Sequence, residues 1–435
     1  MVSADNVNLD VLELIFAHLS GNDLVSIALV SRSFFAGVIP RLYCTLLFRL
    51  AHAKRYPTVM SPFAAVAAHP EFAIHVRHVD IRTVPSVKAQ CNPKFLLECT
   101  GALSLCRNIT SFRCSANALP PFIPALEQKE RLQDVRIHAN LTTEQSAKLV
   151  AGLSAIRNLT LDFASWNLVN LLPLWTADIR RTLTTLTLYM ANELNETVLE
   201  SALAELPGLL GLHVIGCSKV DHVVLLRLVS YTPLLESLSL TTGDSSRTLS
   251  EPPSPLSCLQ HLAIDTRLSP VPLLPTNGTS RLGAILTYIG TAAPPLVSFI
   301  VKFPDSQMAI SQVLVQQLIA RHAKTLKTLA FIDCALGTAD SLTALCRACA
   351  RLERLETHIP VRDLTIFTLA LAKSSSLRSL VDVGSHTHSL RPTLVQENVR
   401  YMMQTVPSLR KVVSDGRIWT VCMHPPPLRR VSSAP

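Results

Sequence analysis

The sequence predicts an α/β repeat protein in which a small helical head precedes a long array of strand–helix units. Within residues 9–43, apolar residues are spaced as in short amphipathic helices. From about Val76 onward one phrase recurs: an apolar residue, two variable residues, an apolar residue, one variable residue and another apolar residue. The composition, 48% hydrophobic and only 16% charged over 435 residues, suits an apolar core shared by many units.

The repeated phrase predicts a series of strands. Within each copy the last two apolar residues lie two positions apart, as a strand with one buried face requires. Most copies are spaced by the roughly 20–29 residues that are typical of leucine-rich repeats. The middle apolar residues of the copies are Val79, Phe112, Val135, Leu159, Leu186, Leu212, Leu238, Leu262, Phe299, Leu329, Leu355, Leu380 and Val412.

Helical segments between the strands complete each unit. Asn195 can cap a helix over 195–206, and Thr142 with Gln145 has the form of a capping box. Asp221 and Asp340 can begin two further helices. One strand and one helix per unit, repeated, predict a solenoid with a parallel sheet on the concave face and helices outside.

A turn residue supports the same fold. The leucine-rich-repeat pattern places Asn or Cys three residues after its last strand residue, where the side chain can satisfy backbone groups as the chain turns. Asn117, Asn140, Cys217 and Cys334 occupy this position. The array therefore resembles a leucine-rich-repeat solenoid, interrupted by loops rich in Pro, Ser and Thr at 241–257 and 266–281.

Charge and cysteine content narrow the classes of function. The net charge of +9 comes from scattered basic residues, which favours a solvated surface over a nucleic-acid-binding site. The eleven cysteines show no disulfide framework. Neither a secretory signal nor an apolar run long enough to span a membrane is present. We therefore expect a soluble, reduced protein of the cytoplasm or nucleus that does not act at a membrane.

The candidate reactive residues favour structural roles. Cys346 and Cys349 form a Cys-x-x-Cys pair, but it lies in an expected helix whose leucines face the core, and no second pair is near. His386-x-His388 and His75-x-x-His78 have no partners at metal-ligand spacing. Phosphate-binding and hydrolase motifs are missing from the sequence. We expect no catalytic residue, no cofactor and no metal site.

The N-terminal head resembles an F-box. The family pattern runs Leu-Pro-x-Glu-Ile/Val-Leu, Ile-Phe, Leu, Asp-Leu and Val-Ser/Cys-Arg/Lys-x-Trp/Phe, and closes with Leu-Trp or Leu-Tyr. Val7-Asn8 replaces the opening Leu-Pro, a dipeptide that helps to contact the adaptor in this family. The matching segments here are Leu9–Leu12, Ile15–Phe16, Leu19, Asp23–Leu24, Val30–Phe34 and Leu42–Tyr43.

The combination is similar to F-box/leucine-rich-repeat proteins, including a large fungal group. This resemblance implies a non-catalytic substrate receptor of an SCF-type (Skp–cullin–F-box) ubiquitin ligase, with a Skp-type adaptor and a cullin as partners. The implied domains are an F-box at 1–50, a helical linker at 51–70, the repeats at 71–418 and a disordered basic Pro/Ser tail at 419–435. The implied adaptor-binding residues, a subset of which shapes the head instead, are Leu9, Val11, Leu12, Ile15, Leu19, Leu24, Val30 and Phe34.

Strand alternation predicts the target-binding face. Leu186 and Leu188 point into the core, so Tyr189 falls on the concave face. Mixed charge and size at such positions favour an unidentified protein target over a polyanion. The rival interpretation is a leucine-rich-repeat scaffold or inhibitor whose head only caps the first repeat. The predicted target-binding residues are Arg113, Arg136, His138, Asp162, Tyr189, His213, Asp265, Lys302 and His358.

Overall fold

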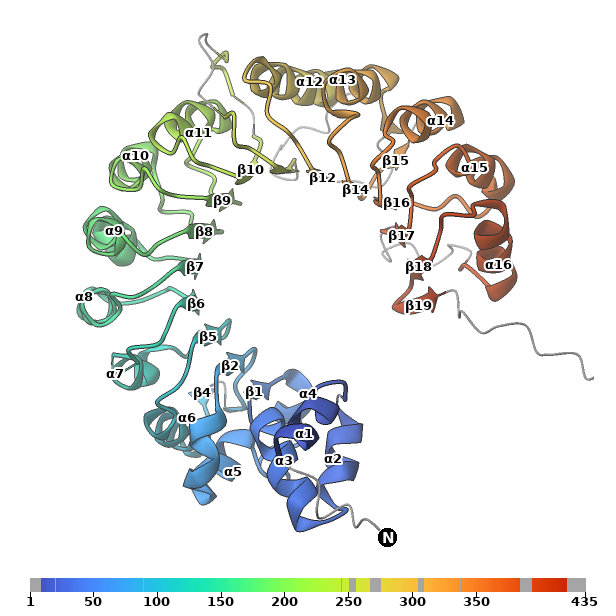
Figure 1. The fold of residues 1–435 in the computed structure, drawn as a ribbon. Helices are drawn as coiled ribbons and strands as arrows, with labels where there is room; N and C mark the ends of the chain where they lie inside the picture. The colour runs from blue at the N-terminus through green and yellow to red at the C-terminus, as the bar shows by residue number, and fades with distance from the viewer. Residues whose placement is uncertain are drawn as a thin grey trace, which may run out of the picture. The chain divides into compact units, whose positions relative to one another are not determined.

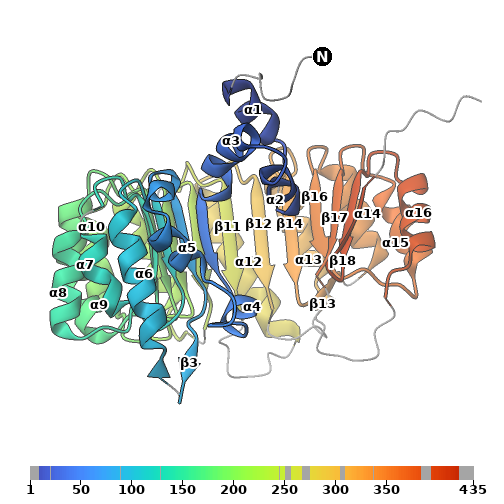
Figure 2. The same ribbon diagram turned by 90° about the horizontal axis from the view of Figure 1, so that it is seen from below.

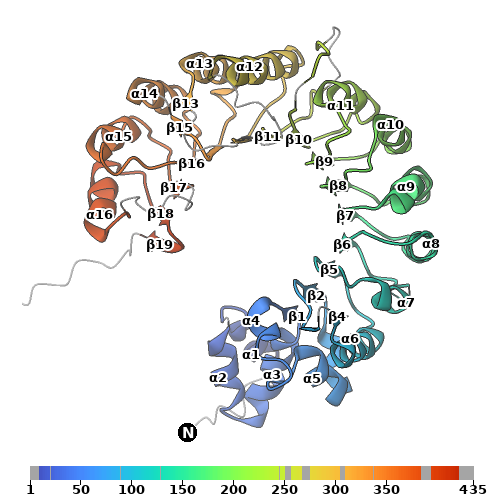
Figure 3. The ribbon, with the colours of Figure 1, turned by 180° about the vertical axis from the view of Figure 1, so that it is seen from behind.

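The computed structural model describes residues 9–19, 21–88, 90–127, 129–243, 245–249, 256–266, 275–303, 309–336, 338–383 and 393–420. The chain divides into two compact units, Met1–Leu235 and Glu236–Pro435. Within each unit, parallel strands form one layer and helices cover one of its faces (Figures 1 and 3). We call the other face of each sheet the open face.

The first unit begins with three short helices and continues as a strand–helix array. Helices α1 (Leu9–Phe16) and α3 (Arg32–Leu42) project from the layer of strands (Figure 2). The head consists of α1 (Leu9–Phe16), α2 (Asn22–Ala28) and α3 (Arg32–Leu42). The array consists of β1 (Thr45–Phe48), α4 (Leu50–Ala53), α5 (Pro62–Ala68), η2 (Pro70–His75), β2 (His78–Ile81), β3 (Ser86–Val87), β4 (Gln90–Cys91), α6 (Pro93–Leu105), β5 (Ser111–Cys114), η3 (Pro120–Phe122), α7 (Ile123–Leu126), β6 (Asp134–His138), α8 (Thr143–Gly152), β7 (Asn158–Asp162), α9 (Trp166–Ile179), β8 (Thr185–Tyr189), α10 (Glu196–Ala204), β9 (Gly211–Ile215), α11 (His222–Leu228) and η4 (Val229–Tyr231).

The sheet of the first unit follows chain order, β1-β2-β5-β6-β7-β8-β9, while β3 and β4 form a separate antiparallel hairpin. Neighbouring strands are parallel and in register, so the middle apolar residues of the repeated phrase face one another. Val79 pairs with Phe112, for example, and Leu159 pairs with Leu186. These side chains are almost fully buried, which confirms the predicted apolar spine.

The second unit repeats the arrangement. Its sheet has the order β10-β11-β12-β14-β16-β17-β18-β19 and is parallel up to β18, after which β19 pairs antiparallel. Strands β13 and β15 form a separate parallel pair. The elements are β10 (Ser237–Thr241), β11 (His261–Asp265), α12 (Pro275–Thr291), β12 (Ser298–Lys302), β13 (Ala309–Ile310), α13 (Gln312–His322), β14 (Thr328–Ile332), β15 (Ala335–Leu336), α14 (Ala339–Ala348), β16 (Arg354–Thr357), α15 (Leu364–Leu371), β17 (Ser379–Asp382), α16 (Gln396–Thr405), β18 (Lys411–Ser414) and β19 (Arg417–Thr420).

The array begins earlier than the sequence predicts. β1 lies inside the expected F-box segment, yet it pairs in parallel with β2, with Leu46 opposite Val79. Helix α5 falls in the expected linker, but it packs against α6 and carries the buried residues Phe63 and Val66. β1 and α5 thus pack with the array although they precede residue 71, and the predicted domain boundaries at residues 50 and 70 stay a prediction.

Helix caps explain where several helices begin. Thr142 and Gln145 form the predicted capping box at α8, and the Asn195 side chain accepts a hydrogen bond from the Val198 N–H at 2.9 Å. Asp221 caps α11 as predicted. Asp340, in contrast, lies in the first turn of α14, and Thr338 is the residue that caps this helix. A hydroxyl at the start of the turn takes the capping role.

Three further expectations differ from the structure. Residues 275–281, expected in a loop, form the start of α12. Trp419 and Thr420, expected in a disordered tail, form the end of β19. This strand is joined to β18 by Asp415 and Gly416, both with positive φ, as a tight hairpin requires. Residues 244, 250–255 and 267–274 of the expected loops, and residues 421–435, lie outside the described residues.

Candidate protein-interaction surfaces

The head has a small apolar core of its own. Leu12, Phe16, Leu24 and Val38 are buried in it, and Phe34 packs against Phe16 with ring centroids 5.5 Å apart. Residues i and i+4 of a helix share a face, so Leu12 and Phe16 both point inward from α1. Leu12 and Leu24, predicted to bind an adaptor, therefore fill the core and do not form a free surface.

A second apolar surface of the head faces solvent. We call it the head surface, and it is formed by one side of α1, by α2 and by the turn after α2. Leu29 is 83% exposed and Leu14 is 70% exposed, which is unusual for leucine. Several large apolar residues exposed on one small module make that module a candidate site of association with other proteins. The head surface comprises Val11, Leu14, Ile15, Val25, Leu29 and Val30.

Three of the eight predicted adaptor-binding residues lie on the head surface: Val11, Ile15 and Val30. Leu19 and Phe34 are partly buried against the head core, and the side chain of Leu9 lies outside the described residues. The sequence prediction missed Leu14, Val25 and Leu29. Because α1 is apolar on both sides, periodicity gave no signal for which side faces inward. Val7 and Asn8 also lie outside the described residues.

Aromatic contacts fix the head to the first strand–helix units. The rings of Tyr43 and Phe72 have centroids 4.5 Å apart, and Phe35 approaches Phe72 edge-on at 6.4 Å. Phe72 belongs to η2, which precedes β2. Tilted and edge-on aromatic pairs of this kind stabilise contacts beyond the burial of area alone. The head therefore presents one apolar face to the array and the head surface to solvent.

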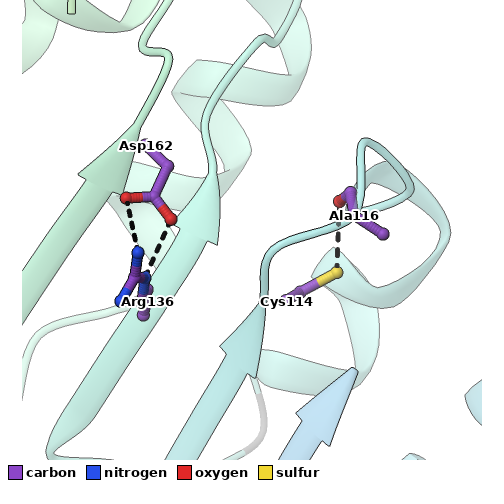
Figure 4. A network of polar contacts seen from close by, with 4 residues as sticks. All are labelled: Cys114, Ala116, Arg136 and Asp162. Carbon is purple, nitrogen blue, oxygen red and sulfur yellow. Dashed lines mark hydrogen bonds and ion pairs between the residues drawn. The ribbon is translucent and has the colours of Figure 1, made fainter. Parts of the chain in front are cut away.

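The open face of the first unit carries most of the predicted target-binding residues. Arg113 and Arg136 are exposed register partners on β5 and β6. Asp162 was expected to be exposed, but it is only 3% exposed, because the Arg136 side chain of the neighbouring strand covers its carboxylate. Its carboxylate accepts hydrogen bonds from Arg136 Nε at 2.8 Å and from Nη2 at 3.4 Å (Figure 4).

An aromatic cluster lies next to this ion pair. The ring of Phe163 stacks on His138 at 5.2 Å and meets Tyr189 edge-on at 6.1 Å. Phe163 is 44% exposed and has a φ of 55°. Burial lowers the pKa of His138 and outweighs the opposing effect of Asp162. The sequence prediction included His138 and Tyr189 but missed Phe163, because alternation says nothing about residues beyond a strand end.

The remaining predicted target-binding residues are partly buried. His213 lies on β9, and burial lowers its pKa. Asp265 and Lys302 are register partners on β11 and β12, and His358 follows β16 in the second unit. The structure thus brings together Arg113, Arg136, His138, Asp162 and Tyr189, and separately Asp265 and Lys302. A target-binding role for any of these residues stays a prediction.

Three cysteines lie in the core, each at the end of a repeat strand or in the turn after it: Cys114, Cys217 and Cys334. Cys217 Sγ is 3.5 Å from the carbonyl oxygen of Leu188, and Cys334 is buried, as expected for turn residues. Cys114 Sγ contacts the Ala116 carbonyl oxygen at 3.4 Å (Figure 4). Burial raises the pKa of the Cys114 thiol to about 12. Such a thiol is a poor nucleophile at neutral pH.

Two predicted turn residues do not fulfil their role. Asn117 and Asn140 are exposed, and within the described chain neither side chain makes a hydrogen bond. The prediction that these two side chains contact the backbone of their turns is therefore wrong. His386 and His388 lie outside the described residues.

The described residues contain neither a candidate metal cluster nor a candidate membrane-spanning helix. Among the described residues, no group of three or more His, Cys, Asp or Glu side chains could hold a metal ion. In the same part of the chain, no helix is long and apolar enough to cross a membrane.

Comparison with known proteins supports the assignment of the head. The F-box domain model matches residues 5–36. No curated protein matches the chain. Two solved structures resemble it: a chain of the Rad7 and Elc1 complex in yeast, with 15% identity, 77% of each chain covered and a TM-score of 0.44, and the leucine-rich-repeat-containing protein LegL7 from Legionella pneumophila, with 12% identity, 83% of this chain and 96% of that chain covered and a TM-score of 0.40.

These observations define an α/β protein of strand–helix repeats with a helical interaction module at its N-terminal end. The module is an F-box domain, and the array that follows is of the leucine-rich-repeat type.

Proposed function

We propose that this protein is a non-catalytic substrate receptor of an SCF-type ubiquitin ligase. The head would bind a Skp-type adaptor, which links it to a cullin, and the open face of the repeats would bind a target protein. The observation that carries the proposal is the match of residues 5–36 to the F-box domain. The exposed apolar head surface is consistent with it, since apolar residues left outside a filled core need a partner.

The mechanism would be proximity. Holding a target close to a ubiquitin-conjugating enzyme on the same scaffold raises the effective concentration of its lysines. The receptor needs no reactive group for this. What it needs is a stable array that keeps the adaptor site and the target site on one chain.

Co-purification with a Skp-type adaptor tests the proposal. Ile15→Asp and Leu29→Asp place a charge on the head surface and leave the head core intact. We expect each to weaken adaptor binding at least about tenfold, because an apolar contact would be replaced by a desolvated charge. Leu97→Asp is the matched control, since Leu97 is 75% exposed on α6, outside the head.

Two results would contradict the proposed receptor function. Wild-type protein that fails to bind the adaptor, or binding that survives both head-surface substitutions, would exclude this receptor function. Leu12→Asp is unsuitable as a test, because Leu12 lies in the head core and a charge there would unfold the head.

A leucine-rich-repeat scaffold without ligase assembly is the second candidate. The contact of Phe72 with Tyr43 and Phe35 favours it, since a head packed in this way caps the end of an apolar array. This candidate predicts that deletion of residues 1–43 exposes apolar surface and lowers solubility, while adaptor binding is absent from the wild-type protein.

A further inference from the structure

A basic pocket lies in the second unit, where four neighbouring strands begin. Its volume is about 740 Å³, within the range of roughly 300–1,000 Å³ that small-molecule sites occupy. Its charged lining residues are four cations, Lys327, Arg351, Arg378 and Arg410, and one acid, Glu353. We call this site the basic pocket.

Backbone hydrogen bonds hold the lining residues side by side. Lys327, Glu353, Arg378 and Arg410 each directly precede a strand of the sheet, β14, β16, β17 and β18. The Glu353 N–H donates to the Lys327 carbonyl at 2.9 Å, the Arg378 N–H to Glu353 at 2.9 Å and the Arg410 N–H to Arg378 at 2.8 Å. Parallel strands lie about 4.8 Å apart, so these side chains leave a fixed edge at close spacing.

The cations of the pocket form no ion pair with the described residues. Among the described residues, the side chains of Lys327, Arg351 and Arg378 form no hydrogen bond and no ion pair, and Arg410 donates only to the Pro407 carbonyl at 2.9 Å. Arg354, which follows Glu353 directly, is in contrast paired with Glu356 at 2.6 Å. The basic pocket therefore concentrates positive charge that an anion would neutralise.

Within the second unit, the row of basic residues is confined to the pocket. The residues in the equivalent position before β10, β11 and β12 are Glu236, Gln260 and Val297, and none of them is basic. Glu353 also interrupts the row of cations. A nucleic-acid backbone would require a continuous basic track, so a compact anion fits better.

We propose that the basic pocket binds a phosphate monoester. The three arginines supply planar guanidinium groups that can donate two parallel hydrogen bonds to phosphate oxygens, and Lys327 adds a further positive charge. Ser375, an exposed lining residue, can donate a hydroxyl hydrogen bond. The phosphate could belong to a phosphorylated side chain of a bound protein or to a free phosphorylated small molecule. The proposal does not depend on adaptor binding.

Calorimetric titration of the full chain at fixed physiological salt tests this site. The probes are glycerol 3-phosphate, a small phosphate monoester, and the tripeptide Gly-phosphoserine-Gly, with Gly-Ser-Gly as the unphosphorylated reference. We expect at least one phosphorylated probe to bind. The double variant Arg378→Gln/Arg410→Gln should weaken that binding at least about tenfold, because two charge-assisted contacts are lost.

Two controls distinguish a built site from general charge attraction. Arg362→Gln/Arg417→Gln removes the same charge from exposed positions outside the pocket and should leave the affinity unchanged. Glu353→Gln removes the acid that lines the pocket and should strengthen binding several-fold, a gain that misfolding cannot produce.

The results distinguish the two possible sources of the phosphate from each other, and both from failure of the proposal. Stronger binding of the phosphorylated tripeptide than of Gly-Ser-Gly indicates a phosphoprotein, and binding of glycerol 3-phosphate alone indicates a free phosphorylated small molecule. Both support a phosphate site. Absence of millimolar binding for both probes, or an equal loss in both double variants, overturns it, while the adaptor-binding test of the head remains unaffected.

Discussion

Arg136 Nε lies 2.8 Å from Asp162 Oδ2 and joins the neighbouring strands β6 and β7 across the open face (Figure 4). The two side chains differ in burial, with 4% of Asp162 exposed and 47% of Arg136. The guanidinium thus covers a carboxylate that has little access to water. This pair contributes to the stability of the sheet as well as to the surface that a target would meet.

Arg136→Ala is predicted to destabilise the first unit. It removes both hydrogen bonds to Asp162 and leaves a buried carboxylate without a cation. An unsatisfied buried polar group costs about 1–3 kcal/mol, and the lower half of that range is expected here because Arg136 is half exposed. Urea unfolding followed by circular dichroism measures the difference.

Arg113→Ala is the matched control for this substitution. Arg113 is the register partner of Arg136 on β5, is exposed, and makes no ion pair within the described residues. A change below about 0.5 kcal/mol is expected for such a surface site. Equal losses in the two variants would show that the contact with Asp162 has no stabilising effect.

Removal of the capping hydroxyl of Thr142 should destabilise α8. The Thr142 hydroxyl accepts a hydrogen bond from the Gln145 N–H, and the Gln145 side chain accepts one from the Thr142 N–H at 3.1 Å. Thr142→Ala should lower the free energy of unfolding by about 1 kcal/mol. On the same helix, Lys148→Ala breaks only a fully exposed pair with Glu144 and should cost less than Thr142→Ala, because solvent screens such a pair. Chemical denaturation that ranks the two variants in reverse would contradict this account.

The repeated phrase predicted the strands well because its signal is both local and redundant. All of the predicted middle residues, from Val79 to Val412, lie on strands, and within each unit they face their neighbours in register. β1 was missed because Leu42 and Tyr43 fit the end of the F-box pattern, so the residues up to 50, including the strand that starts at Thr45, were assigned to the F-box. The phrase is a property of a single strand, so it could be read without knowledge of tertiary contacts.

The interaction surfaces were harder to predict, because burial is decided by what packs on each face. Leu12 and Ile15 are both apolar residues of α1, yet Leu12 is 2% exposed and Ile15 is 52% exposed. Nothing in the local sequence separates them. Likewise, the cations of the basic pocket are far apart in the chain, and only the strand register brings Lys327 close to Arg410.

Gly216→Ala is expected to destabilise the first unit. Gly216 has a φ of 71°, which an L side chain rarely adopts, and an added Cβ would collide with the sulfur of Met190. The expected cost is about 1–2 kcal/mol from the backbone alone. Gly208→Ala is the matched control, because nothing lies within 4 Å of a Cβ added there. Thermal unfolding should show a lower midpoint for Gly216→Ala only, and equal midpoints would contradict the argument.

Cys346 and Cys349 should react slowly with alkylating reagents. Burial raises the pKa of Cys346 to about 12 and that of Cys349 to about 11, so little thiolate exists at neutral pH. Cys44 and Cys258 are only partly buried and should be labelled first. Iodoacetamide labelling followed by mass spectrometry measures the order, with urea-unfolded protein as the control in which all four react alike. Rapid labelling of Cys346 in the folded protein would indicate a functional thiol.

His322 is expected to make the second unit sensitive to acid. It is 2% exposed at the end of α13, and neither ring nitrogen makes a hydrogen bond of good geometry within the described residues. Burial lowers the pKa of His322 below its ordinary value of 6.5, Arg321 lowers it further, and the Pro294 carbonyl opposes both only weakly. The folded state therefore holds this ring neutral where the unfolded chain takes up a proton.

The sign of the effect follows from this difference in proton uptake. Above pH 6.5 both states leave His322 neutral, and the stability is independent of its titration. As the pH falls below 6.5 the unfolded state binds the extra proton, so the free energy of unfolding decreases until the folded pKa is reached. His322→Leu removes the titration. Urea unfolding at several pH values measures the unfolding free energies of this variant and of the wild type. As the pH falls, the stability of the wild type should decrease relative to that of the variant. A difference that stays constant across pH 6.5 would show that His322 is protonated equally in both states.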